Sequence, residues 1–267
     1  MLVAAVCTAT LIAATAGSGD GGDAERPVEK SAEKSVGKSA EKSGDKSGER
    51  SVEGLPAAEI SDKARHELLN AASLHVTVVD RSTGAGATAP SAMDLALDQD
   101  KNCTATLTFG ADGEADIVRR GDRLWLRMDD ALWRARVPGA KGRAAAERFK
   151  GHWVTGPVTA PVLKDYARVC DLDALREQLR GGAESGKAVT KGAPTTLDGT
   201  PVIPLTGTEK DGTRETLYVA ARGTPYALKY TEVGAGAPGA RRTDTTTLYA
   251  GYGQPVPART PAAADAW

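Results

Sequence analysis

A four-residue repeat near the start of the chain limits where a folded structure can form. From Lys30 to Arg50 a basic residue followed by serine recurs every four positions, and three glycines interrupt the run. The repeat has no apolar stripe, and its glycine content disfavours a helix. Residues 17–54 are therefore expected to form a disordered, charged tether. Two readings of this tether stay open: a spacer that crosses an envelope layer, or low-complexity drift without a selected length.

The residues before the tether form a short apolar leader. Residues 1–16 are fewer than the roughly 20 that a transmembrane helix needs, but they have the length of a signal-peptide core. Ala14 to Ala16 forms an A-x-A cleavage pattern at the end of this run. The sequence predicts an exported protein, at the extracellular face of the membrane or in the cell wall. Cys7 follows Val6 inside the apolar run, so it is either a lipid-anchor site or an inert thiol removed with the leader.

The composition changes near residue 55 to that of an ordinary folded domain. All Trp, Tyr and Phe residues lie after position 108. The segment 55–252 is long enough for one domain with its own core. The formal net charge of the whole chain is −1, which argues against a nucleic-acid partner, because binding to phosphate needs a basic face. The tether alternates Lys with acidic residues and so is not a polybasic lipid-binding segment.

Local patterns within 55–252 predict two groups of strands separated by helices. Leu124, Leu126 and Met128 alternate with polar or mixed residues, which is typical of a strand with one apolar face. Asp171 is expected to cap the N-terminus of a helix over 171–179. The expected strands are 74–80, 92–99, 103–110, 114–120, 123–128, 132–137, 187–192, 200–207, 213–220, 225–231 and 241–248, and the expected helices are 56–72, 141–150, 161–169 and 171–179.

Segregated strands and helices favour an α+β fold with an antiparallel sheet. One highly curved sheet, a half-barrel with the helices packed in its hollow, is the economical architecture. Two sheets in a sandwich are the alternative, against which the central helices argue. Residues 253–267 are rich in Pro and Ala and are expected to form an irregular tail.

Cys103 and Cys170 are the only cysteines of the domain. In an exported protein two cysteines usually pair, so a disulfide between them is expected. It would tie the helical segment to the sheet. Two free buried thiols are the alternative, and would be favoured in a cytosolic protein.

The sequence contains no complete catalytic or cofactor-binding motif, and no catalytic residue, metal site or cofactor is expected. His66 and Glu67 resemble the start of the zinc-protease motif H-E-x-x-H, but Asn70 stands in place of the second histidine. Residues 181–187 (GGAESGK) fit part of a phosphate-binding loop, but Ala188 lacks the hydroxyl group that follows the Lys in such loops. A Gly-rich connection explains this segment better.

Five short segments share a pattern of strands and tight turns: 121–133 (GDRLWLRMDDALW), 151–154 (GHWV), 170–172 (CDL), 197–202 (LDGTPV) and 217–226 (LYVAARGTPY). Together with the leader, the tether and the N-terminal helix, they resemble actinobacterial envelope lipoproteins. The group in question is related to the mycobacterial LppX and LprG lipoproteins and to the LolA carriers, and the resemblance spans about residues 57–250.

This resemblance implies a half-barrel, a curved antiparallel sheet wrapped over helices that leaves an apolar cavity. In better-known relatives the cavity takes acyl chains of lipids or lipoproteins. The group usually has a lipid-anchored Cys directly after the apolar run, and this sequence has none there. Ligand contacts in the group do not form a compact motif, so no binding residue is transferred.

The function expected from these observations is non-enzymatic binding or transport of a lipid or lipophilic ligand. For each single candidate position, plain core is favoured over the lining of a cavity. A protein-interaction or envelope-sensor domain, with a partner in the envelope, is the alternative. A hydrolase that uses carboxylates is a third reading. The candidate lining residues lie on apolar strand faces: Leu124, Leu126, Met128, Leu217, Val219 and Leu228.

Overall fold

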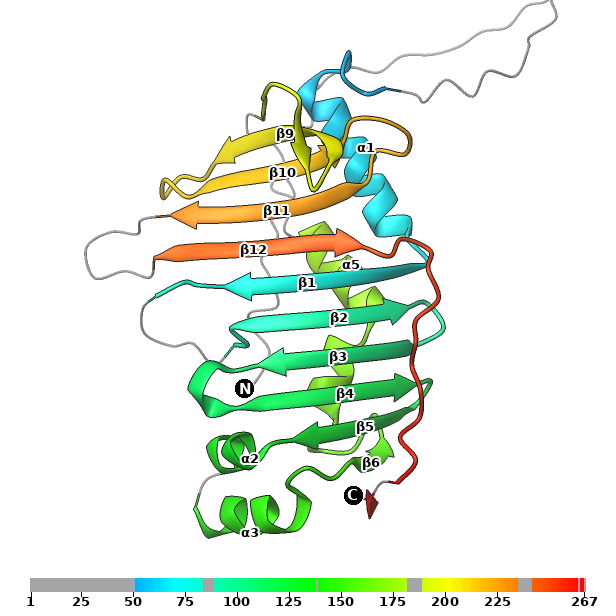
Figure 1. The fold of residues 1–267 in the computed structure, drawn as a ribbon, viewed down its shortest axis with the longest axis vertical. Coiled ribbons are helices and arrows are strands. Elements are labelled where there is room, and N and C mark those ends of the chain that lie inside the picture. Colours follow the sequence, from blue (N-terminus) through cyan, green and yellow to red (C-terminus); the bar gives the residue numbers. More distant parts are fainter. Residues whose placement is uncertain are drawn as a thin grey trace, which may run out of the picture.

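A computed structural model of the chain contains one large, curved sheet with helices against it (Figure 1). It describes residues 51–83, 89–137, 139–181, 189–234, 242–263 and 265–266. The expected leader, and the expected tether up to residue 50, lie outside the described residues. Among the described helices none has both the length and the apolar character needed to cross a membrane.

The described strands join into a single 13-stranded sheet, in the order β13-β6-β5-β4-β3-β2-β1-β12-β11-β10-β9-β7, with β8 on β9. All neighbours are antiparallel except β13 and β6. Two runs of neighbouring strands meet where β1 pairs with β12. The expected α+β class with a curved antiparallel sheet is confirmed.

The elements are α1 (Ala57–Asn70), β1 (Ser73–Asp80), β2 (Ala92–Asp98), β3 (Asn102–Thr108), the 3-10 helix η1 (Gly110–Asp112), β4 (Glu114–Arg120), β5 (Arg123–Met128), α2 (Asp130–Arg136), α3 (Ala140–Phe149), β6 (Val154–Pro157), α4 (Lys164–Val169), α5 (Leu172–Gly181), β7 (Thr190–Lys191), β8 (Thr195–Leu197), β9 (Thr200–Thr208), β10 (Arg214–Ala220), β11 (Ala227–Gly234), β12 (Thr243–Ala250) and β13 (Asp265–Ala266).

Alternation along the strands separates a buried inner face from an outer face. In β1 the buried side chains Leu74, Val76 and Val78 point to one side of the sheet. These side chains form one hydrophobic cluster with Ile60 of α1 and Leu179 of α5. The face that the helices cover is called the inner face below, and Figure 1 shows α5 behind the middle of the sheet.

A disulfide and a buried arginine fasten the helical segment to the inner face. Cys103 and Cys170 are bonded, with their Cα atoms 5.5 Å apart. Arg119 lies opposite Cys103 in the β3–β4 register. One guanidinium nitrogen, Nη1, donates hydrogen bonds to the carbonyl oxygens of Ala167 (3.0 Å) and Cys170 (2.9 Å). The end of α4 is therefore held by both a covalent bond and charge-assisted hydrogen bonds.

The expected strand over 132–137 is wrong, because residues 132–136 belong to α2 and Val137 is the cap that follows the helix. The Asp129 side chain accepts a hydrogen bond from the backbone N–H of Leu132 at 2.7 Å and so caps the helix at its start. Leu132 and Trp133 are both buried. Adjacent buried positions suit a short helix pressed into the core and would point to opposite faces of a strand.

Both ends of the domain take part in the sheet. Near the start, the backbone N–H of Val52 donates to the carbonyl oxygen of Ala221 at 3.1 Å, and the Val52 side chain is buried in the core cluster. Near the end, residues 253–263 are irregular and run along the strand ends in Figure 1 before β13 pairs with β6. Ordered structure therefore begins by Ser51, and the tail closes one edge of the sheet.

Candidate functional site

The six lining positions expected from the sequence fall into two groups. Leu124, Leu126, Met128, Leu217 and Val219 are all buried and belong to the single core cluster. Leu228 is half-buried and lies beside an irregularity in the β10–β11 pairing at Tyr218 and Val219. All five face the same core, but Leu124, Leu126 and Met128 lie on β5 and Leu217 and Val219 on β10, seven strands away, so the structure does not bring the two sets into one site.

We expect Leu126→Ala to behave as a core substitution. The Leu126 side chain is fully buried, so the substitution should lower the free energy of unfolding by about 3 kcal/mol through the lost contacts and the cavity left behind. The measurement is chemical denaturation together with uptake of a fluorescent fatty acid. A small loss of stability with a large change in uptake would instead place Leu126 in an open ligand cavity.

A row of buried polar side chains crosses the inner face at the β10–β12 end of the sheet. Glu215 of β10 lies opposite Glu232 of β11, and Glu232 lies opposite Thr245 of β12. Glu215 has no exposed surface, and Glu232 and Thr245 are each only 9% exposed. Burying carboxylates is costly, so such groups are functional-site candidates.

Two residues along these strands, the next pair of inward-facing side chains is also polar. Tyr230 and Thr247 face each other across β11 and β12, and both are buried. The Tyr230 hydroxyl group donates to the Glu232 carboxylate at 3.4 Å. Burial raises the pKa of Tyr230 well above its ordinary value, and the charges of Glu232 and Glu215 raise it further. The hydroxyl group therefore stays protonated and acts as a donor.

The sequence itself carries a signal that places a glutamate in this row. Glu215 is two residues before the expected lining residue Leu217, so both side chains must point to the same face of β10. Strand parity alone therefore places Glu215 on the inner face, whereas the usual exposure of glutamate suggests the opposite.

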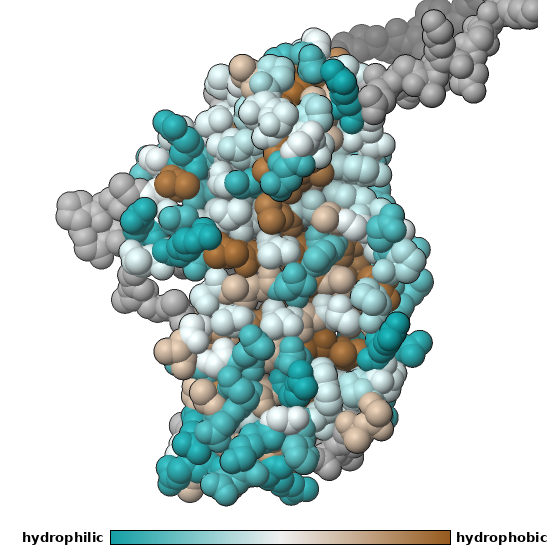
Figure 2. Space-filling model, in the orientation of Figure 1, coloured by the Kyte–Doolittle hydropathy of each residue, from teal (hydrophilic) through white to brown (hydrophobic). Residues whose placement is uncertain are grey.

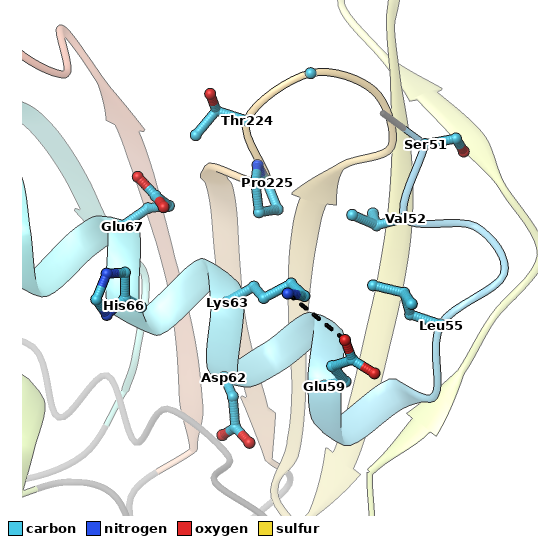
Figure 3. Close-up of a pocket in the computed structure, with 11 residues that line it drawn as sticks. Ser51, Val52, Leu55, Glu59, Asp62, Lys63, His66, Glu67, Thr224 and Pro225 are labelled. Atoms are coloured by element: carbon cyan, nitrogen blue, oxygen red, sulfur yellow. Dashed lines mark ion pairs between the residues drawn. The ribbon is translucent and has the colours of Figure 1, made fainter. Parts of the chain in front are cut away.

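A separate groove lies beside α1, with a volume of about 890 Å³. Figure 3 shows Glu59, Lys63 and Glu67 of α1 on the side of the helix that faces Val52 and the turn at Thr224 and Pro225, whereas Asp62 points away from them. Lys63 Nζ lies 3.5 Å from a carboxylate oxygen of Glu59. The size suits a ligand or a peptide. The lining residues are Ser51, Val52, Leu55, Glu59, Asp62, Lys63, His66, Glu67, Gly223, Thr224 and Pro225.

The incomplete zinc-protease motif forms part of this groove. His66 and Glu67 both line it, while the Asn70 side chain donates to the His66 carbonyl oxygen at 2.8 Å. Asn70 therefore serves the helix end rather than a metal. Within the described parts of the chain, no three His, Cys, Asp or Glu side chains cluster closely enough to hold a metal ion. The GGAESGK segment lies, apart from Gly181, outside the described residues.

Comparison with known proteins gives similarities to solved structures only. No protein-family model and no curated protein sequence matches the chain. The lipoprotein LppX of Mycobacterium tuberculosis is 10% identical, with a TM-score of 0.47 over 76% of this chain and 98% of LppX. LprF from Mycobacterium bovis is 14% identical, with a TM-score of 0.49 over 78% of this chain and 97% of LprF. A LolA superfamily protein from Nitrosomonas europaea is 12% identical, with a TM-score of 0.23 over 73% of this chain and 92% of that protein.

Proposed function

We propose that the chain is an exported, non-enzymatic protein that binds or carries a lipid or another lipophilic ligand. The observation that carries this proposal is the change of character along the inner face. Over β1 to β5 the face is apolar except for Arg119, and over β10 to β12 it carries the buried polar residues Glu215, Glu232 and Thr245. An amphiphile has the same two-part character, and ligand sites are mostly apolar with a few polar groups that set orientation.

The ligand site in this proposal lies where the apolar and polar parts meet. Leu217 belongs to both regions, because it lies opposite Tyr230 and on the same strand face as Glu215. The carboxylates accept hydrogen bonds from a hydroxyl or amino head group, and the neighbouring apolar residues contact the hydrocarbon.

The apolar leader and the tether support export, and the sequence resemblance to actinobacterial envelope lipoproteins supports the lipid class of ligand. The proposal places the domain at the outer face of the membrane or in the cell wall, held by the tether. It includes attachment to the membrane through a lipid anchor. It assigns no catalysis, because the sequence carries no complete catalytic motif.

Titration with a fluorescent long-chain amine and a fluorescent fatty acid tests the ligand site. We expect Glu215→Gln together with Glu232→Gln to weaken amine binding at least tenfold, because two charged acceptors are lost and each is worth about 1.5–3 kcal/mol. Fatty-acid binding should weaken less or improve. The matched control is Glu59→Gln with Glu67→Gln in the α1 groove, which removes the same charge. An equal loss in both double variants would contradict the proposed site.

The α1 groove favours a second candidate, a protein-interaction or sensor domain. Its lining combines charged side chains of α1 with the apolar side chains of Val52, Leu55 and Pro225, and a mixed surface of this kind suits a peptide. A photo-crosslinking residue at Thr224 in the groove should then trap an envelope protein in living cells, and the same residue at the exposed position Lys210 should not. Identical crosslinks at both positions would remove this candidate.

A further inference from the structure

Charge is distributed very unevenly along the chain. Residues 119–152 contain ten Lys and Arg against four Asp and Glu, a net charge of +6. The whole chain carries −1, so all other residues together carry −7. The net charge of the whole chain is therefore near zero although one region is strongly basic. This region includes β5, α2 and α3.

The basic side chains of α2 and α3 form an exposed surface, called the basic face here. Glu147 is the single carboxylate on α3, and Arg134 of α2 lies 3.1 Å from the Asp130 carboxylate. Figure 2 shows hydrophilic side chains gathered at the end of the molecule where Figure 1 places α2 and α3. The exposed members of the basic face are Arg134, Lys141, Arg143, Arg148 and Lys150.

The two helices display these cations from a rigid base. Trp133 of α2 and Phe149 of α3 pack with their ring centroids 5.7 Å apart, and both are buried. Ala146 of α3 is also buried and belongs to the same core cluster. Because the apolar side of α3 is fixed, its charged side points outward without any rearrangement of the fold.

We propose that the basic face docks on a membrane surface that contains anionic phospholipids. Clustered Lys and Arg side chains are attracted to such surfaces by about 1 kcal/mol for each cation near the lipid. A lipid surface is favoured over other anions because the exposed cations are spread over two helices, so a complementary partner must be broad.

The position of the basic face suits a tethered domain. Ser51, where the tether ends, pairs with Arg222 directly after β10, and β10 is seven strand spacings from β5, or about 34 Å. The expected tether therefore joins the domain at the end of the sheet opposite the basic face. This step rests on the proposed export, but it needs no bound ligand.

The test is co-sedimentation of the full chain with vesicles of phosphatidylglycerol mixed with phosphatidylcholine, and with vesicles of phosphatidylcholine alone. We expect Lys141→Gln, Arg143→Gln, Arg148→Gln and Lys150→Gln together to lower binding to the anionic vesicles by about 10-fold to several hundred-fold, since each cation contributes about fivefold. Raising the salt concentration should weaken the wild type and leave this variant almost unchanged.

Two further variants make the result specific. The charge-matched control carries Lys63→Gln, Lys210→Gln, Arg214→Gln and Arg222→Gln, all exposed and remote from α3, and should bind as the wild type does. Arg143→Lys with Arg148→Lys keeps the charge and should also bind normally. The leader is present in every variant, so its contribution cancels.

An equal loss in the remote control, or equal binding to the two kinds of vesicle, would overturn the docking surface. Fatty-acid and amine uptake should be the same in the basic-face variants as in the wild type, because the basic face is remote from Glu215. Loss of docking with normal uptake, or the reverse, therefore separates this inference from the proposed ligand site.

Discussion

Replacement of Arg119 by methionine is expected to lower the free energy of unfolding by about 3–5 kcal/mol. Arg119 is buried, with only 3% of its surface exposed. Its guanidinium group donates to the carbonyl oxygens of Gly121, Ala167 and Cys170 at 2.9–3.0 Å. Methionine fills a similar space but leaves these acceptors without their donor, and unmade hydrogen bonds in the interior are costly.

The measurement is the urea midpoint, with the slope of the transition compared to show that the unfolded state is unchanged. Arg120→Met is the matched control, because Arg120 is the next residue on the same strand but is exposed. Arg120→Met should change the free energy of unfolding by no more than about 0.5 kcal/mol. Similar losses for the two variants would show that Arg119 does not fasten α4 to the sheet.

Removal of the disulfide is expected to cost about 4 kcal/mol in the chain-entropy model. The bond joins residues separated by 67 positions, so it strongly restricts the unfolded chain. The double variant Cys103→Ala and Cys170→Ala avoids placing a hydroxyl group at two buried sites. Its unfolding in urea should match that of the wild type in the presence of a reducing agent. A wild type that is unaffected by reduction would contradict this prediction.

The hydrogen bonds of Arg119 and the disulfide act on the same chain segment, so their effects should not be additive. Both restrain Cys170, one through its carbonyl oxygen and one through its sulfur atom. A double-mutant cycle that combines Arg119→Met with the two alanine substitutions should therefore show a coupling of about 0.5–3 kcal/mol. Strict additivity would mean that the two restraints stabilise separate parts of the fold.

Much of the fold was predictable because single strands carry their own signal. In β5, Leu124, Leu126 and Met128 alternate with Trp125 and Arg127, and the structure buries these three side chains on one face of the strand. Asp171 accepts hydrogen bonds from the backbone N–H groups of Asp173 and Ala174, as expected for the cap of α5. In these elements local pattern and tertiary packing agree.

The misassigned α2 shows where local pattern fails. The residues after Asp129 include Leu132 and Trp133, which are acceptable in either a strand or a helix. The Asp129 cap and the burial of these two adjacent side chains against the core favour the helix over the strand. Short strands such as β8 were also missed, because three residues carry no measurable period.

The candidate site was less predictable than the fold. Leu217 and Val219 were expected on the inner face, but the glutamates beside them were not. A sequence shows that Glu215 shares the face of Leu217, yet it does not show that β11 places Glu232 directly opposite. That proximity depends on the strand register, which only the assembled sheet fixes.

Native mass spectrometry of the full chain tests the ligand proposal most directly. The protein would be produced through an oxidising export route, purified without detergent, and measured before and after extraction with organic solvent. We expect an additional mass of lipid size that disappears on extraction, and a protein mass two hydrogens lighter than the reduced chain. A protein free of any adduct, which also takes up no added lipid or fatty acid, would contradict the proposed lipid-binding function.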